Sequence, residues 1–256
     1  DVDAIREALQ PGRRMVVVGG GYIGLETAAV GVQAGLDVTV LEMESRILQR
    51  VTTESMSDYY TRVHESRGVT IRCNTRVTAF EGEGRVERVR CEDGDEIPAD
   101  IVIIGVGILP VTDIAEQAGL EVDDGIVVDD HCRTSDPDIY AAGDCTKHPS
   151  QLLGRAVRLE SVPNAMEQAR VAAANMCGKD KVYDAVPWFW SDQYDLKLQM
   201  VGFSNEADSE VVRGDPESGP FARFYLRDGR VVAVDAVNCP KEFMIAKKLV
   251  ANGAEV

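Results

Sequence analysis

The feature that most constrains the fold is a run of glycines between an apolar segment and a segment with helical spacing. Residues 19–24 read Gly-Gly-Gly-Tyr-Ile-Gly and satisfy the pattern Gly-x-Gly-x-x-Gly. This pattern directly follows a predicted buried strand, residues 15–18, and opens a predicted helix, residues 22–34. A second predicted strand, 37–42, follows at once. The order strand, tight turn, helix, strand indicates a βαβ unit with a parallel pair of strands.

The three glycines of the pattern have separate roles in such a unit. Gly19 permits the tight turn, Gly21 lets the backbone approach a pyrophosphate, and Gly24 lets the helix pack closely on the strand. The pyrophosphate would lie at the helix N-terminus, where unpaired N–H groups and the helix dipole favour an anion. The other interpretation is a turn that only packs a helix on a sheet, and the residue at the end of the second strand argues against it.

That residue is Glu42, which follows Gly24 by 18 positions. A carboxylate there can accept hydrogen bonds from an adenosine ribose, and it would repel a 2′-phosphate, so the sequence predicts NAD rather than NADP. Arg46 and Arg50 are close enough to weaken this preference, although either can also hold the pyrophosphate or be solvated. Glu26, one turn into the helix, either matches the helix dipole or orients the nicotinamide end.

The rest of the chain alternates between helical and strand patterns, which predicts an α/β fold. Further helices are expected at 2–9, 54–66, shortly after Pro110, at 163–177 and at 241–251. Short strands at 69–73, 76–82 and 85–91, punctuated by EGEG and EDGDE, predict an antiparallel insert before a buried strand at 101–105. Later strands are expected in GIVVDD, in TSDPDIYAAGDC, in LKLQMVG, in EVVRG and in a hairpin that turns at Asp228-Gly229.

Composition excludes several classes of protein. The net charge of −16 opposes nonspecific binding to nucleic acid. The longest apolar runs are far shorter than the roughly 20 residues that cross a bilayer, so no membrane span is expected. The six cysteines and three histidines show no zinc spacing, so no metal site is predicted. Thiols that remain free suit a reducing compartment, which predicts a cytoplasmic protein.

A second chemical feature lies in TSDPDIYAAGDC, where the expected strand ends at Gly143 and Asp144 follows. A small residue there lets a ligand approach, and a carboxylate at the carboxyl end of a strand can bind a sugar-like hydroxyl. A Gly-Asp pair by itself is more often structural. The segments around it decide between the two interpretations.

Five segments occur in an order and at a spacing that resemble a known family: VVVGGGYIGLE, IVIIGVGILP, TSDPDIYAAGDC, RLESVPNAMEQA and PWFWSDQYDLKLQMVG. The chain resembles the NADH-dependent ferredoxin reductases of oxygenase systems, of the putidaredoxin and rhodocoxin reductase type. These belong to the FAD-dependent pyridine nucleotide-disulfide oxidoreductases. The resemblance covers essentially the whole chain, and PWFWSDQ is its most specific part.

The resemblance implies a Rossmann-like NAD-binding domain with an antiparallel insert at 1–111, the second part of an FAD-binding domain at 112–186, and a C-terminal α+β domain at 187–256. It implies NAD contacts at Gly19, Gly21, Tyr22, Ile23, Gly24, Glu42 and Arg50, with Glu26, Gly105, Val106 and Gly107 beside the nicotinamide. It implies FAD contacts at Gly143, Asp144, Val162 and Trp190, and a ferredoxin-docking role for Arg170. Glu26 and Trp190 are the expected catalytic positions.

The resemblance further implies that NADH reduces FAD and that the reduced flavin passes single electrons to an iron–sulfur ferredoxin, which supplies an oxygenase. The family's N-terminal FAD segment has no counterpart here, and the C-terminal tail is shorter, so the chain is expected to be a fragment that retains NAD better than FAD. Two alternatives stay open. One is another FAD-dependent NADH oxidoreductase, of the monodehydroascorbate, nitrite or disulfide reductase type, and the other is an NAD(H)-binding module without turnover.

Overall fold

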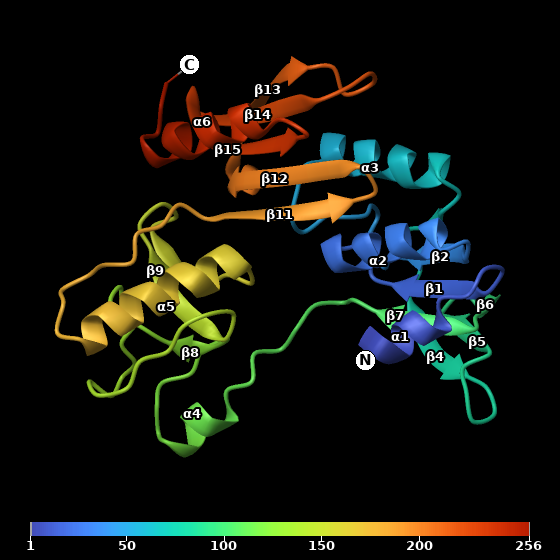
Figure 1. Cartoon of the computed structure of the whole chain (residues 1–256), viewed down its shortest axis with the longest axis horizontal. Helices are drawn as coiled ribbons and strands as arrows, with labels where there is room; N and C mark the ends of the chain where they lie inside the picture. Colours follow the sequence, from blue (N-terminus) through green and yellow to red (C-terminus); the bar gives the residue numbers. More distant parts are fainter. Residues whose placement is uncertain (1, 256) are drawn as a thin grey trace.

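The structure is a computed structural model that describes residues 2–255. The outer bounds of the expected domains, residues 1 and 256, lie outside this range. Within it the strands form four sheets, which Figure 1 shows distributed over three regions of the molecule. No helix in the described range is long and apolar enough to cross a membrane.

The βαβ unit predicted from the glycine run is present. Strand β1 (Arg14–Val18) pairs in parallel with β2 (Asp37–Leu41), and α2 (Tyr22–Gln33) connects them. Strand β7 (Ile101–Ile104) pairs with the other edge of β1, and β3 (Thr70–Arg72) pairs with β2, in the order β3-β2-β1-β7. Apolar runs make these strands because a parallel sheet is covered on both faces.

Short elements surround this parallel sheet. Helix α1 (Val2–Ala8) precedes it, and α3 (Glu54–Ser66) has the predicted bounds. The expected antiparallel insert is confirmed for its second and third strands, which are β4 (Val77–Glu81) and β5 (Arg88–Cys91). The segment 69–73, also expected in the insert, instead forms β3 of the parallel sheet, and the third strand of the insert is β6 (Glu96–Pro98), which was not predicted. Its middle strand begins three residues later than predicted, because the turn that starts at Gly82 continues to Glu87, whose N–H donates to Glu81 O.

The middle of the chain forms a separate small body. It consists of α4 (Asp113–Gln117), β8 (Ile126–Val127), β9 (Thr146–Ser150), β10 (Arg155–Arg158) and α5 (Val162–Met176). Strand β9 pairs in parallel with β8 and antiparallel with β10. Its buried cluster contains Cys132, Val171, Ala172 and Tyr183.

The strand predicted in TSDPDIYAAGDC is wrong. The segment contains a single isolated bridge, between Arg133 and Tyr140, within the described residues. Side chains bond to the backbone locally instead: Asp136 Oδ1 accepts from the Asp138 N–H at 2.9 Å, and the Thr134 hydroxyl donates to Ile139 O at 3.0 Å. Such bonds compete with a sheet ladder. Asp144 therefore precedes β9 and does not follow a strand, contrary to the prediction.

The last region is an antiparallel sheet with the order β11-β12-β15-β14-β13. Its strands are β11 (Trp188–Gln193), β12 (Leu196–Gly202), β13 (Ser209–Gly214), β14 (Phe221–Arg227) and β15 (Arg230–Val237). The short helix η1 (Ser204–Glu206) follows β12, and α6 (Pro240–Ala251) packs on the sheet. The predicted hairpin turn at Asp228-Gly229 is confirmed, with φ of +51° and +73°.

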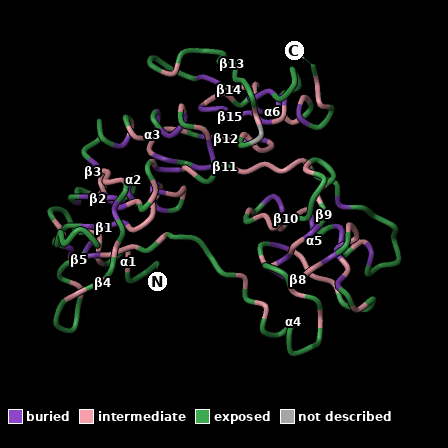
Figure 2. The backbone as a smooth tube through the Cα atoms, turned by 180° about the vertical axis from the view of Figure 1, so that it is seen from behind, coloured by how far each residue is buried: buried purple, intermediate pink, exposed green. Residues whose placement is uncertain are grey.

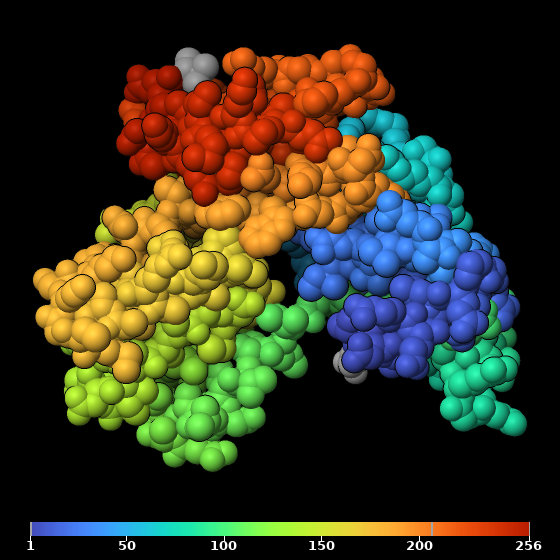
Figure 3. All heavy atoms as spheres, in the orientation of Figure 1, coloured from blue at the N-terminus to red at the C-terminus, as the bar shows by residue number. Residues whose placement is uncertain are grey.

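One buried cluster joins the first region to the last. It contains Leu25, Ile47, Leu48, Met56, Tyr59 and Tyr60 from the first region and Leu198, Met200, Phe221 and Val237 from the last. Figure 2 shows this buried backbone where α2 and α3 meet β11 and β12. Figure 3 shows an open cleft between the blue N-terminal region and the green and yellow middle region, crossed by the segment that leaves β7.

Candidate dinucleotide site

The glycine turn has the geometry that a close backbone approach requires. Gly19 adopts a φ of +104°, and a Cβ on it would lie 2.4 Å from Gly105 O. A Cβ on Gly24 would lie 2.0 Å from Gly19 O, whereas one on Gly21 would meet nothing within 4 Å. Gly19 and Gly24 are thus required by packing inside the protein, and Gly21 faces open space. The turn after β7 lies directly beside the glycine turn.

The start of α2 offers unpaired N–H groups. Its N-cap is Gly21, which has no side chain that could cap the helix, and its first turn carries no acidic residue. The first N–H groups of a helix have no partner inside the helix. An anion placed over Gly21 would therefore receive these donors and the positive end of the helix dipole. A pyrophosphate fits this position.

Glu42 is held beside the glycine turn at the end of β2. Its Oε2 accepts from the Gly20 N–H at 2.7 Å, and its Oε1 accepts from the Glu44 N–H at 2.9 Å. The side chain is half-buried, so its position is fixed while part of it faces solvent. A carboxylate has further lone pairs on both oxygens. It can still accept hydrogen bonds from a ribose.

The two arginines near Glu42 differ in their availability. The Arg46 guanidinium points inward and donates to the Ser57 hydroxyl at 2.5 Å and to Thr52 O at 3.1 Å. These bonds hold Arg46 away from a ligand phosphate. Arg50 is exposed. Of the two arginines, Arg50 is therefore the one with an exposed side chain.

The two residues between the glycines point in different directions. The Tyr22 ring packs edge-on against Phe189, with 4.9 Å between centroids, and its hydroxyl lies 2.9 Å from Met200 Sδ. Burial raises the pKa of Tyr22. The Ile23 side chain, in contrast, is 64% exposed. The Tyr22 side chain thus joins α2 to the C-terminal sheet, whereas the Ile23 side chain stays exposed.

Glu26 makes a contact that the sequence did not indicate. Its Oε1 accepts a hydrogen bond from the Ser191 hydroxyl at 2.6 Å. Ser191 lies on β11, is fully buried, and is 165 positions from Glu26 in the chain. The sequence did not indicate Ser191, because 188–193 was not predicted as a strand.

The turn after β7 presents Val106, which is 55% exposed, and Gly107, with a φ of +112°.

Three of the four residues expected to bind FAD lie on α5 or beside it. The Gly143 N–H donates to Gln168 Oε1 at 2.7 Å, and a Cβ on Gly143 would lie 3.6 Å from the Ala165 Cβ. Asp144 is exposed next to this contact, and Val162, the first residue of α5, is also exposed. Gln168, which the sequence reading missed, is buried and also bonds to Thr146 and His148.

The remaining expected residues lie on neighbouring surfaces. Trp190 is 42% exposed on β11, which contacts α5, and its ring centroid lies 5.8 Å from that of Trp188. Arg170 is exposed on α5 and forms an ion pair with Glu167. Trp190 therefore lies on the strand that also carries Ser191, and Arg170 lies on the helix that begins at the Gly143 contact.

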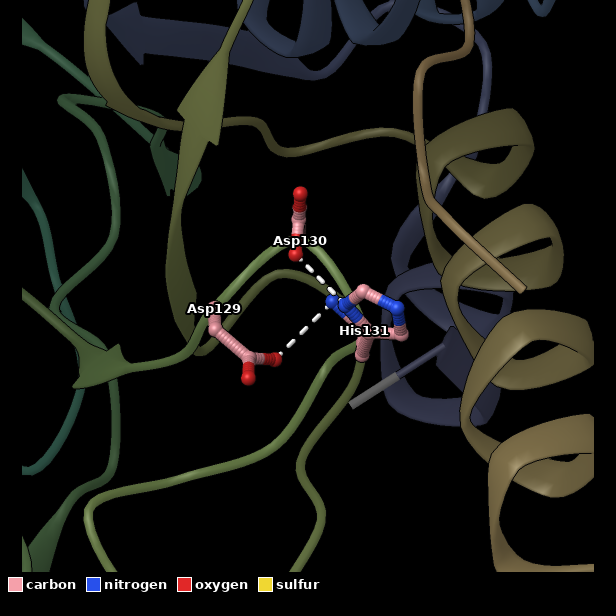
Figure 4. Close-up of side chains that lie close together, drawn as sticks. All are labelled: Asp129, Asp130 and His131. Atoms are coloured by element: carbon pink, nitrogen blue, oxygen red, sulfur yellow. Dashed lines mark hydrogen bonds and ion pairs between the residues drawn. The ribbon is translucent and has the colours of Figure 1, made fainter. Parts of the chain in front are cut away.

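An acidic cluster with one histidine lies far from the glycine turn along the chain (Figure 4). His131 Nδ1 lies 2.6 Å from Asp130 Oδ1. Its Nε2 lies 2.9 Å from Asp180 Oδ1, on a residue outside the close-up. The His131 N–H donates to Asp129 Oδ1 at 2.9 Å. The carboxylates raise the pKa of His131. Because both ring nitrogens have carboxylate partners, hydrogen bonds and charge attraction explain the cluster without an ion.

Comparison with known proteins agrees with this geometry. Residues 1–169 match the model of the pyridine nucleotide-disulphide oxidoreductase family, and residues 188–256 match the reductase C-terminal family. The chain is 49% identical to putidaredoxin reductase of Pseudomonas putida, over 98% of this chain and 60% of that protein. It is 47% identical to the ferredoxin–NAD(+) reductase component of an anthranilate 1,2-dioxygenase system of Burkholderia cepacia, over 99% of this chain and 63% of that protein.

A solved structure also matches closely. A covalent complex of putidaredoxin reductase with putidaredoxin superposes with a TM-score of 0.96 at 48% identity, over 100% of this chain and 62% of that chain. The chain thus spans about three fifths of the length of the relatives it matches. The α/β fold expected from the sequence is confirmed.

Proposed function

The chain belongs to the pyridine nucleotide-disulphide oxidoreductase family, and on that basis we propose that it is the NADH-binding and partner-facing portion of a ferredoxin reductase. The whole protein passes electrons from NADH through FAD to an iron–sulfur ferredoxin that supplies an oxygenase. The observation that carries the proposal is the glycine turn with Glu42 bonded beside it. The names of the relatives, which are reductases of oxygenase systems, support the choice of acceptor.

The proposed NAD site uses groups from one edge of the parallel sheet. The backbone at Gly19–Gly24 holds the pyrophosphate, Glu42 the adenosine ribose, and Arg50 the outer side of the phosphates. The turn at 105–107 and Glu26 lie beside the nicotinamide. Support comes from the uncapped start of α2 and from the contact between the two turns.

The proposed FAD site is the surface at the start of α5. FAD, when bound, accepts a hydride and releases electrons one at a time. Gly143 allows the close approach, Asp144 holds a hydroxyl-bearing chain of the cofactor, and Val162 and Trp190 lie along the ring. The exposure of Asp144 and Val162, and of Trp190 on β11, a strand that contacts α5, fits part of such a cofactor.

We assign the ferredoxin to the surface that includes Arg170. Residues 147–197 carry seven basic and six acidic side chains in a chain with a net charge of −16, so this stretch repels an acidic partner less than the chain as a whole does. The division into domains at 1–111, 112–186 and 187–256 is part of the proposal, and the separate sheets support it. We also propose a cytoplasmic location, supported by six cysteines that are all free in the described structure.

The decisive experiment measures steady-state reduction of an iron–sulfur ferredoxin by the whole, FAD-loaded protein. The donors are NADH and NADPH, and the competing acceptor is a disulfide. We expect NADH-driven ferredoxin reduction, with NADPH used roughly tenfold less well because Glu42 repels its 2′-phosphate. Glu42→Gln should narrow that preference, and Glu65→Gln, an exposed residue on α3, should not. Turnover of the disulfide without turnover of the ferredoxin would overturn the proposal.

A further inference from the structure

A chain of hydrogen bonds runs through the contact between α3, β11 and α2. The Tyr194 hydroxyl lies 2.9 Å from His64 Nδ1, and His64 Nε2 lies 2.8 Å from Gln193 Oε1. Gln193 Nε2 lies 3.0 Å from Ser191 Oγ, which lies 2.6 Å from Glu26 Oε1. The three middle residues are fully buried, and the two end residues of this hydrogen-bond chain, Tyr194 and Glu26, are half-buried.

The Glu26 carboxylate fixes the direction of every bond in this chain. A carboxylate can only accept, so the Ser191 hydroxyl must donate to it and must accept from the Gln193 amide. The amide oxygen of Gln193 then faces His64 and requires a proton on Nε2. His64 Nδ1 consequently accepts from the Tyr194 hydroxyl. All four donors therefore point toward Glu26.

Burial keeps this arrangement in one state. Burial lowers the pKa of His64, so the ring is neutral at neutral pH and carries its one proton on Nε2. An unpaired buried polar atom costs free energy, so none of the middle residues can turn away without leaving its neighbour unsatisfied. The outer end is held as well, because the Arg67 guanidinium lies 4.3 Å from the Tyr194 ring centroid.

Because of where Glu26 lies, these hydrogen bonds also bear on how the ligand is held. Glu26 lies one turn into the helix whose start holds the pyrophosphate, and Ser191 occupies its Oε1. Its Oε2 has no hydrogen-bond partner among the described residues and can accept from the amide of a nicotinamide. We propose that Ser191, oriented by Gln193 and His64, is a positioning residue that holds the Glu26 carboxylate for the nicotinamide end of NADH.

This inference rests on the proposed NAD site, and its test separates the two. NADH and ADP-ribose share the pyrophosphate and the adenosine, but ADP-ribose lacks the nicotinamide. Calorimetric titration of the chain with both ligands gives an affinity ratio that reports the nicotinamide end alone. A chain that binds neither ligand would overturn the proposed site. A chain that binds both equally would overturn only the positioning role.

We expect Ser191→Ala to lower the affinity for NADH about five- to tenfold, since one charge-assisted hydrogen bond is lost, and to leave that for ADP-ribose unchanged. In a Glu26→Gln background the same substitution should cause no further loss. Ser57→Ala removes another fully buried serine hydroxyl and should leave the ratio unchanged. Equal losses of Ser191→Ala in both backgrounds would indicate a purely structural role and would overturn the inference.

If thermal unfolding shows that Ser191→Ala does not fold, a second variant tests the same inference. Tyr194→Phe lies at the half-exposed end and keeps the aromatic ring that packs on His64, with 5.0 Å between centroids. It removes the donor that holds His64 in the required tautomer. The affinity ratio should fall about two- to threefold because a neutral hydrogen bond is lost. An unchanged ratio would contradict the inference.

Discussion

At the scale of single residues, Asp235 is a buried carboxyl group of the C-terminal sheet. It lies on β15, is 4% exposed, and its Oδ2 accepts from the Thr52 hydroxyl and the Tyr225 hydroxyl, both at 2.9 Å. Burial raises its pKa from an ordinary 3.8 to about 6, more than the two donors lower it. Loss of water costs a buried carboxylate more than two neutral donors return.

This raised pKa predicts a pH dependence of stability. The folded state binds the proton more tightly than the unfolded state, so the stabilising contribution is complete below about pH 4 and is lost as pH rises through about 6. The loss amounts to about 3 kcal/mol. Urea unfolding between pH 4 and 7 should show that the free energy of unfolding of the unchanged chain falls relative to Asp235→Asn.

The histidines provide the contrast for that measurement. Burial lowers the pKa of His64 and of His148, so their contributions are lost as pH falls below about 6.5. Both are present in the unchanged chain and in the variant, and they cancel in the difference. Parallel curves for the two proteins would contradict the assignment of a raised pKa to Asp235.

Single residues also show how far the sequence could predict the site. The positions of Gly24 and Glu42 beside the glycine turn were predictable, because each contacts that turn from within one βαβ unit. Ser191 and Gln168 were not. Ser191 meets Glu26 across 165 positions, and Gln168 meets Gly143 across 25. A buried serine or glutamine has no periodic signal of its own, and only the packed structure brings its partner to it.

At the scale of elements, the approach of α2 to the end of β1 decides the form of the site. A Cβ on Gly24 would lie 2.0 Å from Gly19 O, a backbone atom that cannot move aside cheaply. Gly31 on the same helix would meet the end of the Met15 side chain at 2.8 Å, which can shift. A side chain at position 24 therefore requires the backbone to move, whereas one at position 31 requires only a side chain to move.

This difference predicts the effect of alanine at each position. Alanine favours a helix by about 1 kcal/mol over glycine, but the clash at Gly24 exceeds that gain and displaces α2 from the turn. Gly24→Ala should lower the affinity for NADH more than tenfold and should lower the free energy of unfolding by about 1–3 kcal/mol. Gly31→Ala, the control, should keep the affinity. Calorimetry that finds Gly24→Ala as tight as the unchanged chain would refute this account.

The elements that the sequence predicted best are those with a strong period. Helix α3 was predicted with its observed bounds, and β12 likewise, because their apolar residues recur at regular spacing. The strand expected before Gly143 failed because Thr134 and Asp136 bond to nearby backbone, and this competition is not visible in hydropathy. Strand β11 was missed because its aromatic residues lie on both faces and its buried positions are Ser191 and Gln193.

At the scale of the whole molecule, the first and last regions share a core that the middle region lacks. Leu198 of β12 belongs to the cluster that also contains Tyr60 of α3. Val171 of α5 belongs to a separate cluster. The first and third domains expected from the sequence are therefore coupled through side chains, although the second domain separates them along the chain.

This coupling predicts which parts unfold together. Leu198→Ala should lower the free energy of unfolding by about 2–5 kcal/mol, because it leaves a cavity in the shared core. Hydrogen exchange should then quicken in α3 as well as in β12 and should stay unchanged in α5. Val171→Ala should show the reverse pattern. Faster exchange in β12 without a change in α3 would show that the two regions unfold separately.

The contact between Tyr22 and Met200 joins residues 178 positions apart. A ribosome that adds about 5–20 residues per second needs roughly 9–36 s to make the chain between them. During that interval the apolar side of α2 has been synthesised but its covering strand has not. Newly made chains thus pass through a period in which this side is open to chaperones, and its length depends on the rate of translation rather than on the rate of folding.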